Sequence, residues 1–367
     1  MASAKKKRTG VAGFITPHGF GHAARAAAVL TALRELRPKM HPHLFTGVPR
    51  WFLRESLGRE FSLHPLESDI GLVQGGPLGE DLPATAARLS ALYPPDDALV
   101  ARLACRVSRL GCRLVLCDIA PLGIAVARAA GLPSVLVENF TWGWIYRGCA
   151  AREPALLPFA RMLDDLSRRA DLRVQAQPVC RVEDGAAQVG PVSCRPRAAR
   201  AATRAALGVA PRRPVVLVTM GGIPHDGFAV QPLLGLPGVE FVLAGAASRP
   251  RRVANVLLLP HRSGFFHPDL MAAADAVVGK IGYSTVAESC RSRVPYGFVP
   301  RAGFRESAAL ERWLLDRKRG LRIDPHDFAA GTWVRRVPDL LDLGRPAEQF
   351  PDGAQQAAEL IRERFGL

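Results

Sequence analysis

Two histidines in a glycine-rich loop are the residues of this sequence with the clearest capacity for chemistry. The segment from Thr16 to Leu33 reads TPHGFGHAARAAAVLTAL and carries His18 and His22. A neutral imidazole can take a proton from a hydroxyl group near neutral pH. Histidines that only cap a helix are the alternative, but two of them in one loop favour catalysis. Arg25 is expected to meet an anionic group or to lie in solvent.

Asp118 is a carboxylate that could work with these histidines. It stands in CDIAP, directly after a buried strand expected at Leu114–Leu116. An Asp at the carboxyl end of a central strand lies at the mouth of the crevice where such folds bind ligands. There it can bond to a histidine ring N–H and set the tautomer. A helix N-cap is an equally good interpretation, and this residue alone leaves both open.

A second cluster lies between Ala274 and Arg301. An expected strand ends at Gly279-Lys280, and a turn then leads into a helix through Gly282, Ser284 and Thr285. Free N–H groups and hydroxyls at a helix start suit a diphosphate, and Lys280 adds positive charge. Glu288 follows Thr285 at the spacing of a capping box, which is the structural alternative. The assembled pattern favours a carboxylate that binds ribose hydroxyls.

Alternating strands and helices must position both clusters. The N-terminal loop lacks the last glycine of the GxGxxG fingerprint and the GK[ST] of a phosphate-binding P-loop. Strands are expected at 11–16, 43–46, 114–116, 132–137, 214–219, 239–244, 256–259, 276–278 and 296–299, with helices at 22–36, 122–130, 285–292 and 352–365. This alternation in both halves predicts an α/β protein with two Rossmann-like domains, each a doubly wound parallel sheet.

The length of 367 residues also favours two domains. A stretch rich in Pro, Arg and Ala over residues 190–214 is the expected linker. We therefore predict an N-terminal domain over residues 1–190 and a C-terminal domain over residues 191–345. The segment 346–367 is predicted to hold a helix that packs back across the boundary.

The charge of +16 is unusual, with 49 basic against 33 acidic residues. The basic residues are scattered, so we attribute the charge to composition and expect no specific nucleic-acid partner; peripheral contact with an acidic membrane surface stays open. No apolar run reaches the roughly twenty residues of a membrane span. The segment Lys5–Arg8 is expected to be a solvated tail, and the protein is expected to be cytoplasmic.

The seven cysteines form no CxxC pair, which indicates reduced thiols and no zinc site.

Gly282–Glu288 and the strand Pro295–Pro300 resemble the donor site of GT-B glycosyltransferases. That family includes the MurG type and the UDP-glycosyltransferases. The resemblance implies a fold of two Rossmann-like domains facing a cleft. It implies that Gly282, Ser284 and Thr285 bind the donor diphosphate and that Glu288 binds the ribose. Lys280 stands where UDP-glycosyltransferases often have a histidine, and its charge is expected to contribute to diphosphate binding. Residues expected near the donor sugar or base are Gly221, Gly222, Phe265, Phe266, Arg305 and Glu306.

The chain is also similar, over most of residues 11–310 and more closely in its N-terminal half, to the glycosyltransferase-like region of L-arabinokinase and its bacterial stand-alone relatives. The shared stretches are TPHGFGHAAR, TGVP, SDIGLVQ, CDIAP, ENFTWGWIY and KIGYSTVAE. This resemblance implies His22, with His18 in reserve, as the catalytic base, oriented by Asp118. It places Arg25, Asn139 and Trp142 on the acceptor side. Kinase activity is not implied, because no Gly-rich ATP loop is present.

Together these resemblances imply an inverting, metal-independent glycosyltransferase of the EC 2.4 type. Its donor would be a nucleotide-sugar, UDP-sugar favoured, used as a co-substrate with no further cofactor. The acceptor hydroxyl is not identified. A non-catalytic nucleotide-sugar binding or regulatory module and a GT-B UDP-sugar epimerase are the alternatives. No paired-Asp metal motif stands at a strand end.

Overall fold

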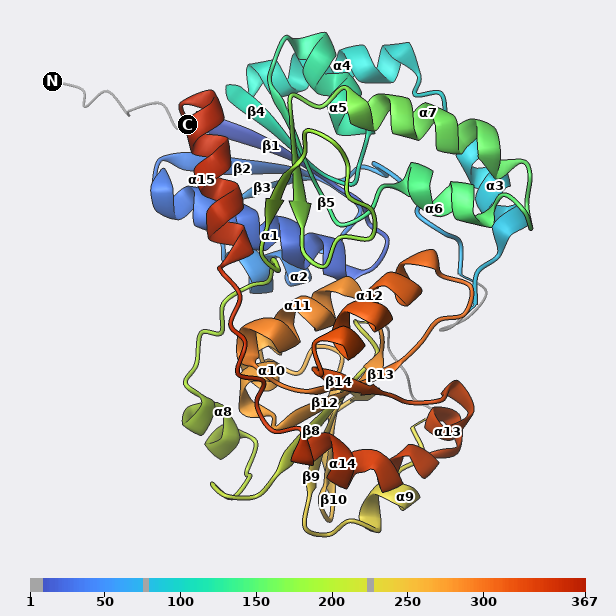
Figure 1. The fold of residues 1–367 in the computed structure, drawn as a ribbon. Coiled ribbons are helices and arrows are strands. Elements are labelled where there is room, and N and C mark those ends of the chain that lie inside the picture. The colour runs from blue at the N-terminus through green and yellow to red at the C-terminus, as the bar shows by residue number, and fades with distance from the viewer. Residues whose placement is uncertain (1–8, 75–78, 223–227) are drawn as a thin grey trace, which may run out of the picture. The chain divides into compact units, whose positions relative to one another are not determined.

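The computed structural model describes residues 9–74, 79–222 and 228–367, and these residues form two compact units (Figure 1). Of the described residues, the first unit contains 9–74, 80–192 and 352–367, and the second contains 79, 193–222 and 228–351. The expected solvated tail at Lys5–Arg8 lies outside the described residues. The C-terminal helix thus belongs to the first unit, although the chain reaches it only after completing the second.

The first unit is built on a seven-stranded sheet with the order β3-β2-β1-β4-β5-β6-β7, and all neighbouring strands are parallel. The strands are β1 (Thr9–Ile15), β2 (Met40–Phe45), β3 (Ser62–His64), β4 (Cys112–Asp118), β5 (Ser134–Glu138), β6 (Leu172–Ala176) and β7 (Ala187–Val189). The strand order reverses between β1 and β4. Ligands of doubly wound sheets bind at this switch point, beyond the carboxyl ends of the strands.

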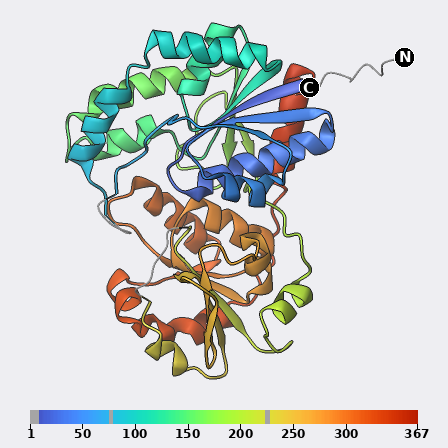
Figure 2. The same cartoon turned by 180° about the vertical axis from the view of Figure 1, so that it is seen from behind.

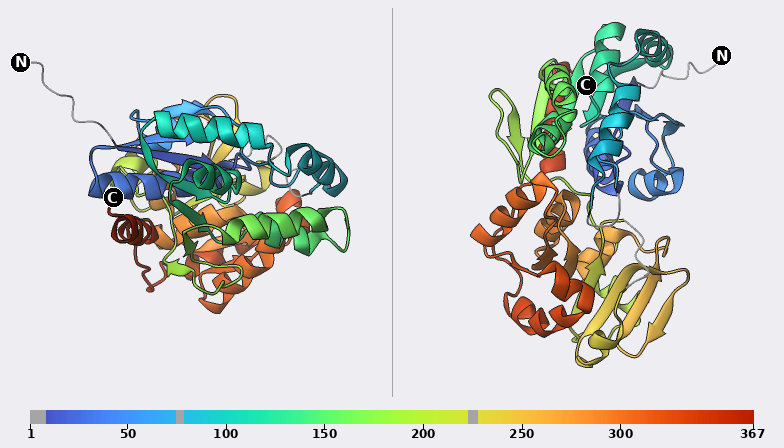
Figure 3. Two further views of the ribbon diagram at one scale, coloured as in Figure 1. Left: turned by 90° about the horizontal axis from the view of Figure 1, so that it is seen from above. Right: turned by 90° about the vertical axis from the view of Figure 1, so that its right-hand side faces the viewer.

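Helices cover both faces of this sheet, as Figures 1 and 3 show. One face carries α1 (Phe20–Leu36), α2 (Arg50–Leu57) and α15 (Gly353–Phe365), and the other carries α4 (Asp97–Arg109), α5 (Leu122–Ala130) and α7 (Leu156–Arg168). The view from behind in Figure 2 shows α1 and α2, in blue, against the sheet. The unit also contains α3 (Leu82–Leu92) and α6 (Trp142–Cys149). Because both faces are covered, the central strands are apolar runs.

The second unit repeats this plan with the strand order β10-β11-β9-β8-β12-β13-β14. The strands are β8 (Val215–Thr219), β9 (Glu240–Ala247), β10 (Arg251–Val253), β11 (Val256–Pro260), β12 (Ala276–Lys280), β13 (Tyr296–Val299) and β14 (Gly320–Arg322). Only the edge pair of β10 and β11 is antiparallel among these described strands. The switch point lies between β8 and β12.

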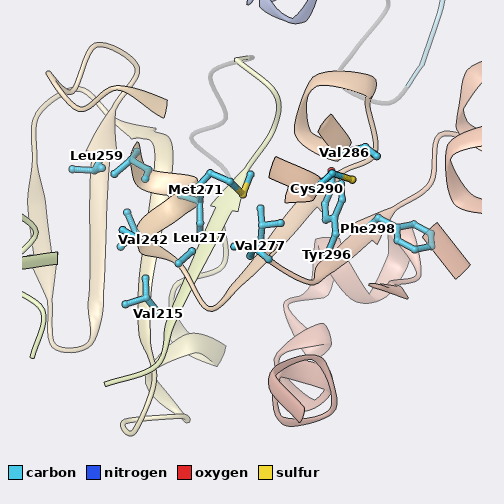
Figure 4. Close-up of a cluster of buried hydrophobic side chains, with 14 of the residues drawn as sticks. Val215, Leu217, Val242, Leu259, Met271, Val277, Val286, Cys290, Tyr296 and Phe298 are labelled. Carbon is cyan, nitrogen blue, oxygen red and sulfur yellow. The ribbon is translucent and has the colours of Figure 1, made fainter. Parts of the chain in front are cut away.

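Two hydrophobic cores hold the second unit together, one on each face of its sheet. Figure 4 shows the first, in which Val277 and Phe298 of the strands lie with Met271 and Val286 of the helices. The helices around the sheet are α8 (Arg200–Ala206), α9 (Gln231–Leu234), α10 (His267–Ala273), α11 (Tyr283–Ser292), α12 (Arg305–Asp316), α13 (Pro325–Ala330), η1 (Thr332–Arg336) and α14 (Val337–Asp342). The second core involves α9, α13, η1 and α14.

The predicted α/β class with two Rossmann-like sheets is confirmed. The expected helix at 122–130 and strand at 296–299 have the observed bounds. The helix expected from Thr285 begins earlier, at Tyr283, because Gly282 is its N-cap. All seven cysteines are free thiols and five of them are buried. None of the helices in the described part of the chain is long and apolar enough to cross a membrane.

Candidate functional site

The first cluster is centred on His22 and Asp118, at the switch point of the first unit. Gly19, with a φ of +78°, caps α1, so His22 falls in the first turn of that helix. Asp118 is the last residue of β4 and is fully buried. Its Oδ1 lies 3.0 Å from His22 Nδ1. The expected pairing of this carboxylate with a loop histidine is therefore present, and the partner is His22.

Arg25 completes the cluster from one turn further along α1. Its Nε donates to Asp118 Oδ2 at 2.8 Å, and its Nη2 donates to Asp118 Oδ1 at 2.7 Å. Its Nη1 donates to Asn139 Oδ1 at 2.6 Å. Arg25 is 1% exposed, so the alternative of a solvated surface residue is wrong.

The charges around Asp118 keep it ionised. Burial opposes its ionisation, but the Arg25 guanidinium and the hydrogen bonds from His22 and Arg25 outweigh burial and hold the pKa of Asp118 below its usual range. Arg25 Nη2 also lies 3.3 Å from His22 Nδ1. Because the carboxylate is the stronger acceptor and the nearer atom, we assign the ring proton to Nδ1. Nε2 then carries the lone pair that can accept a proton.

Asp118 is not the N-cap of the next helix, which was its alternative role. Helix α5 begins at Leu122 after Pro121, and no side chain caps it. Instead, the residue after Asp118 has unusual backbone geometry: Ile119 has a φ of +40°. This conformation is rare for a β-branched residue and clusters at functional sites.

His18 and Trp142 lie beside this pair. The ring of Trp142 meets His18 edge-on at 5.1 Å between centroids and lies 6.1 Å from the ring of His22. Trp142 is 1% exposed and begins α6. The structure thus gathers all the residues predicted for the catalytic and acceptor side of the first unit.

The second cluster lies at the switch point of the second unit, where β8 and β12 end. Lys280, the last residue of β12, is 8% exposed. Burial and then Arg301 lower the pKa of Lys280 to about 8, while Glu306 opposes this shift. Gly221 is close by, since a Cβ atom there would lie 3.8 Å from Lys280 Cε. A lysine held beside an arginine in this way is a ready partner for a polyanion.

The turn after Lys280 leads into α11. Gly282 is the N-cap with no side-chain cap bond, Ser284 is half-buried, and Thr285 is buried within the first turn with its side chain against Tyr296. Because Thr285 is inside the helix rather than at its N-cap, the capping-box alternative for Glu288 is wrong.

Glu288 is paired with a histidine instead. His267 Nδ1 lies 2.6 Å from Glu288 Oε2, and His267 Nε2 lies 3.3 Å from Thr219 Oγ1. This chain of contacts joins the end of β8 to α11 through α10. His267 therefore orients the carboxylate that was predicted to bind ribose.

Of the other predicted donor residues, Gly221 and Glu306 lie near Lys280. Gly221 and Gly222 have φ of +67° and +85°, and Glu306 is buried at the start of α12 while Arg305 is exposed. Phe265 packs against the core, and Arg197 covers the ring of Phe266 at 4.0 Å. Among the described residues, no group of three or more His, Cys, Asp or Glu could hold a metal ion.

Two residues of the second cluster were not predicted from the sequence. Arg301 is buried and lies over the ring of Phe304 at 4.2 Å, and Thr219 ends β8. Their position in the sequence could have identified them, because each residue stands at or just after the carboxyl end of a strand, where ligands of such sheets bind.

No protein-family model matches the chain. The chain is 28% identical over 369 residues to L-arabinokinase of Arabidopsis thaliana, a match that covers 98% of this chain and 35% of that protein. The chain therefore spans about a third of the length of this relative. It is 22% identical over 275 residues to an uncharacterized glycosyltransferase of Methanopyrus kandleri, covering 70% of this chain and 76% of that protein.

Solved structures share the fold. The plant protein UGT2 of Phytolacca americana, solved with UDP-2fluoro-glucose and pterostilbene, has a TM-score of 0.60 at 16% identity, covering 97% of this chain and 93% of that one. MurG of Acinetobacter baumannii has a TM-score of 0.54 at 15% identity, covering 97% and 99%. The two doubly wound sheets and the similarity to these solved structures define the class of fold. The chain has the GT-B fold of the glycosyltransferases.

Proposed function

We propose that this chain is a glycosyltransferase of the EC 2.4 type that moves a sugar from a nucleotide-diphosphate donor to a hydroxyl acceptor. The observation that carries the proposal is the His22–Asp118 pair, 3.0 Å apart at the switch point of the first unit. A buried carboxylate that fixes the histidine tautomer is the arrangement that general-base catalysis needs. The GT-B neighbours solved with UDP-sugars favour a UDP-sugar donor.

The proposed reaction divides its tasks between the two units. His22 Nε2 takes the proton of the acceptor hydroxyl as its oxygen attacks the anomeric carbon, and the bond to the nucleotide diphosphate breaks. A single displacement of this kind inverts the anomeric centre. In the second unit, Lys280, Arg301 and the N-terminus of α11 offset the charge of the leaving diphosphate. Because these cations are part of the chain, the proposed reaction requires no divalent metal.

A non-catalytic nucleotide-sugar module is the second candidate. The relative from Arabidopsis thaliana favours it, because this chain matches only a part of a protein named for another activity.

The test is a product analysis with UDP-sugars, a panel of hydroxyl acceptors, and EDTA in a parallel arm. Acceptor-dependent release of UDP with an inverted anomeric centre, unchanged by EDTA, is expected. Binding of UDP-sugar without turnover would favour the module. A changed sugar without any acceptor would identify an epimerase. Activity that EDTA abolishes and a divalent ion restores would reject the metal-independent mechanism.

A further inference from the structure

The loop 16–19, which carries His18 and leads into α1, is held by long hydrogen bonds. The Thr16 backbone N–H donates to Asp118 O, and the His18 backbone N–H donates to Thr16 Oγ1, both at 3.4 Å. Such bonds usually measure about 2.9–3.0 Å. Gly19, with its φ of +78°, then caps α1. Bonds of this length hold the loop loosely, so its contacts with neighbouring segments decide where α1, and with it His22, begins.

The segment 68–71 lies against this loop. Ser68 Oγ donates to the carbonyl oxygen of Ile15, the last residue of β1, at 2.8 Å. Gly71 packs on His18 itself, since a Cβ atom on Gly71 would lie 2.4 Å from His18 Cγ and 2.6 Å from His18 Cβ. These atoms are at the root of the side chain. Rotation of the ring about its Cβ–Cγ bond therefore cannot make room for a larger residue than glycine.

Hydrogen bonds on two sides hold Gly71 in place. Asp69 Oδ1 accepts the backbone N–H groups of Ile70 at 2.7 Å and Gly71 at 3.3 Å. An Asp side chain that bonds to the N–H groups following it fixes the local backbone. Tyr146 of α6 is fully buried and donates its hydroxyl to Gly71 O at 2.7 Å. The backbone that meets His18 is thus tied both to its own segment and to a helix of the core.

Trp142 connects His18 to His22. Its ring meets His18 edge-on at 5.1 Å between centroids and lies 6.1 Å from the ring of His22. It also stacks on Tyr146 at 5.8 Å, so α6 supports both Gly71 and the ring that contacts the two histidines. A displacement of His18 would therefore reach His22 along the chain and through Trp142.

We propose that the segment 68–71, here called the brace, positions His22 for catalysis and that His18 is the contact through which it acts. Gly71 and His18 are then positioning residues, and His18 is not a second base. Where it concerns the rate of transfer, this inference rests on the proposed function. The placement of the His22 ring does not depend on that function and is measured separately.

The first test adds a methyl group at Gly71. Gly71→Ala should displace His18 and reduce kcat by roughly ten- to hundredfold, because a misplacement of about 1 Å can cost that much. The KM for the nucleotide-sugar should change little, since the proposed donor residues lie in the second unit. Gly111→Ala is the matched control: its φ of +69° is similar, but a Cβ atom there would meet nothing within 4 Å among the described residues. Equal losses of kcat in the two variants would overturn the proposal.

The tautomer of His22 is a second readout that needs no turnover. In the wild-type chain the Nδ1 proton shared with Asp118 should appear in a long-range proton–nitrogen NMR spectrum of histidine-labelled protein, with His22→Ala identifying the signals. Gly71→Ala should lose this fixed tautomer, and Gly111→Ala should keep it. An unchanged His22 spectrum in folded Gly71→Ala would count decisively against the brace.

A gentler variant decides the matter if Gly71→Ala does not fold. Tyr146→Phe keeps the ring and removes only the hydrogen bond to Gly71 O. It should shift the His22 signals and lower kcat by about two- to tenfold, the effect of one hydrogen bond. If neither quantity changes in this variant, the brace does not position His22.

The route through His18 is tested by a double-mutant cycle. His18→Ala removes the atoms that a Cβ atom on Gly71 would meet, so in this background Gly71→Ala should lower kcat no more than Gly111→Ala does. His18→Ala alone should cost far less than the roughly 10²–10⁴-fold of a lost general base. The same loss from Gly71→Ala in both backgrounds would refute the route. So would a His18→Ala variant that loses transfer while the His22 tautomer is unchanged.

Failure of this inference is distinguishable from failure of the proposed function. A chain that transfers sugar from no donor would reject the transferase, and the His22 spectra would still support or overturn the brace. Transfer at the full rate in folded Gly71→Ala would overturn the brace and leave the transferase intact.

Discussion

At the scale of single residues, the structure gives each proposed site one buried carboxylate and one histidine. In the first unit Asp118 orients His22, and in the second His267 orients Glu288. The imidazole has a different task in each pair. Nδ1 of His22 is occupied, which leaves Nε2 for proton transfer, whereas both nitrogens of His267 contact protein groups. The geometry therefore favours His22 as the base and His267 as a positioning residue.

His22→Ala should reduce single-turnover transfer by roughly 10²–10⁴-fold, the usual contribution of a general base, with little change in nucleotide affinity. Asp118→Asn should slow turnover as well, and the two losses should not add, because the residues act as a unit. Unfolding temperatures must accompany these rates, since Asp118 also neutralises buried Arg25. Near-normal turnover in folded His22→Ala would transfer the role to His18.

Nucleotide affinity should depend on pH through Lys280. The folded protein lowers the pKa of this ammonium to about 8, so the free site loses its charge as the pH rises above about 8. Bound diphosphate favours the charged form. The Kd for UDP should therefore rise above pH 8, by up to about tenfold per pH unit. Lys280→Arg should flatten this profile, because a guanidinium stays charged. The same slope in a folded Lys280→Arg variant would exclude Lys280.

At the scale of elements, the ends of β8 and β12 lie so close together that one position admits only glycine. Gly279 in β12 has a φ of +157°, and a Cβ atom there would lie 1.8 Å from Thr219 O. This approach brings Thr219 and Lys280 to the same edge of the sheet. The local backbone of two strands thus shapes the second cluster.

Gly279→Ala should destabilise the second unit by at least about 3 kcal/mol, because the methyl group meets backbone that cannot move away. Urea unfolding with hydrogen exchange on β8 and β12 measures the effect. Gly238→Ala is the control: a Cβ atom there would meet nothing within 4 Å, and the change should stay within about 0.5 kcal/mol. Equal stability of the two variants would contradict the argument.

At the scale of the whole molecule, the chain crosses from the first unit to the second and returns. Helix α15 packs on α1 and against β6 and β7 of the first unit. The contact is close, since a Cβ atom at Gly353 would lie 1.9 Å from Gly190 O, and the Gln356 side chain accepts the N–H of Gly190 at 2.8 Å. Residues from the end of the chain therefore complete the first unit.

A chain that ends at Pro351 should lose hydrogen-exchange protection in α1, β6 and β7, because Ala357, Ala358 and Ile361 no longer cover them. Protection of β8 and β12 should change little. Removal of Gly366 and Leu367 alone is the control and should leave both units protected. A loss confined to the second unit would show that α15 is not part of the first.

The spacing of apolar residues and the positions of glycine and proline were enough to predict the two Rossmann-like units and the loops that carry the proposed site residues. Apolar runs that end in glycine-rich turns located the ends of β1 and β12, and the apolar run before Asp118 located the end of β4, because a strand covered on both faces must be apolar and its turn must not be. Each of Asp118, Arg25 and Glu288 had two alternative roles, and local sequence could not decide between them. Those choices depended on contacts between residues up to 114 positions apart.

The sequence predicted that the C-terminal helix packs back across the boundary, but only the tertiary structure showed which elements α15 covers, namely α1, β6 and β7. The pairing of His267 with Glu288 likewise joins residues of α10 and α11 that no local sequence pattern connects. Burial and pairing are properties of the packed chain. A residue type predicts what a side chain can do, and only its neighbours in space decide whether it meets a partner.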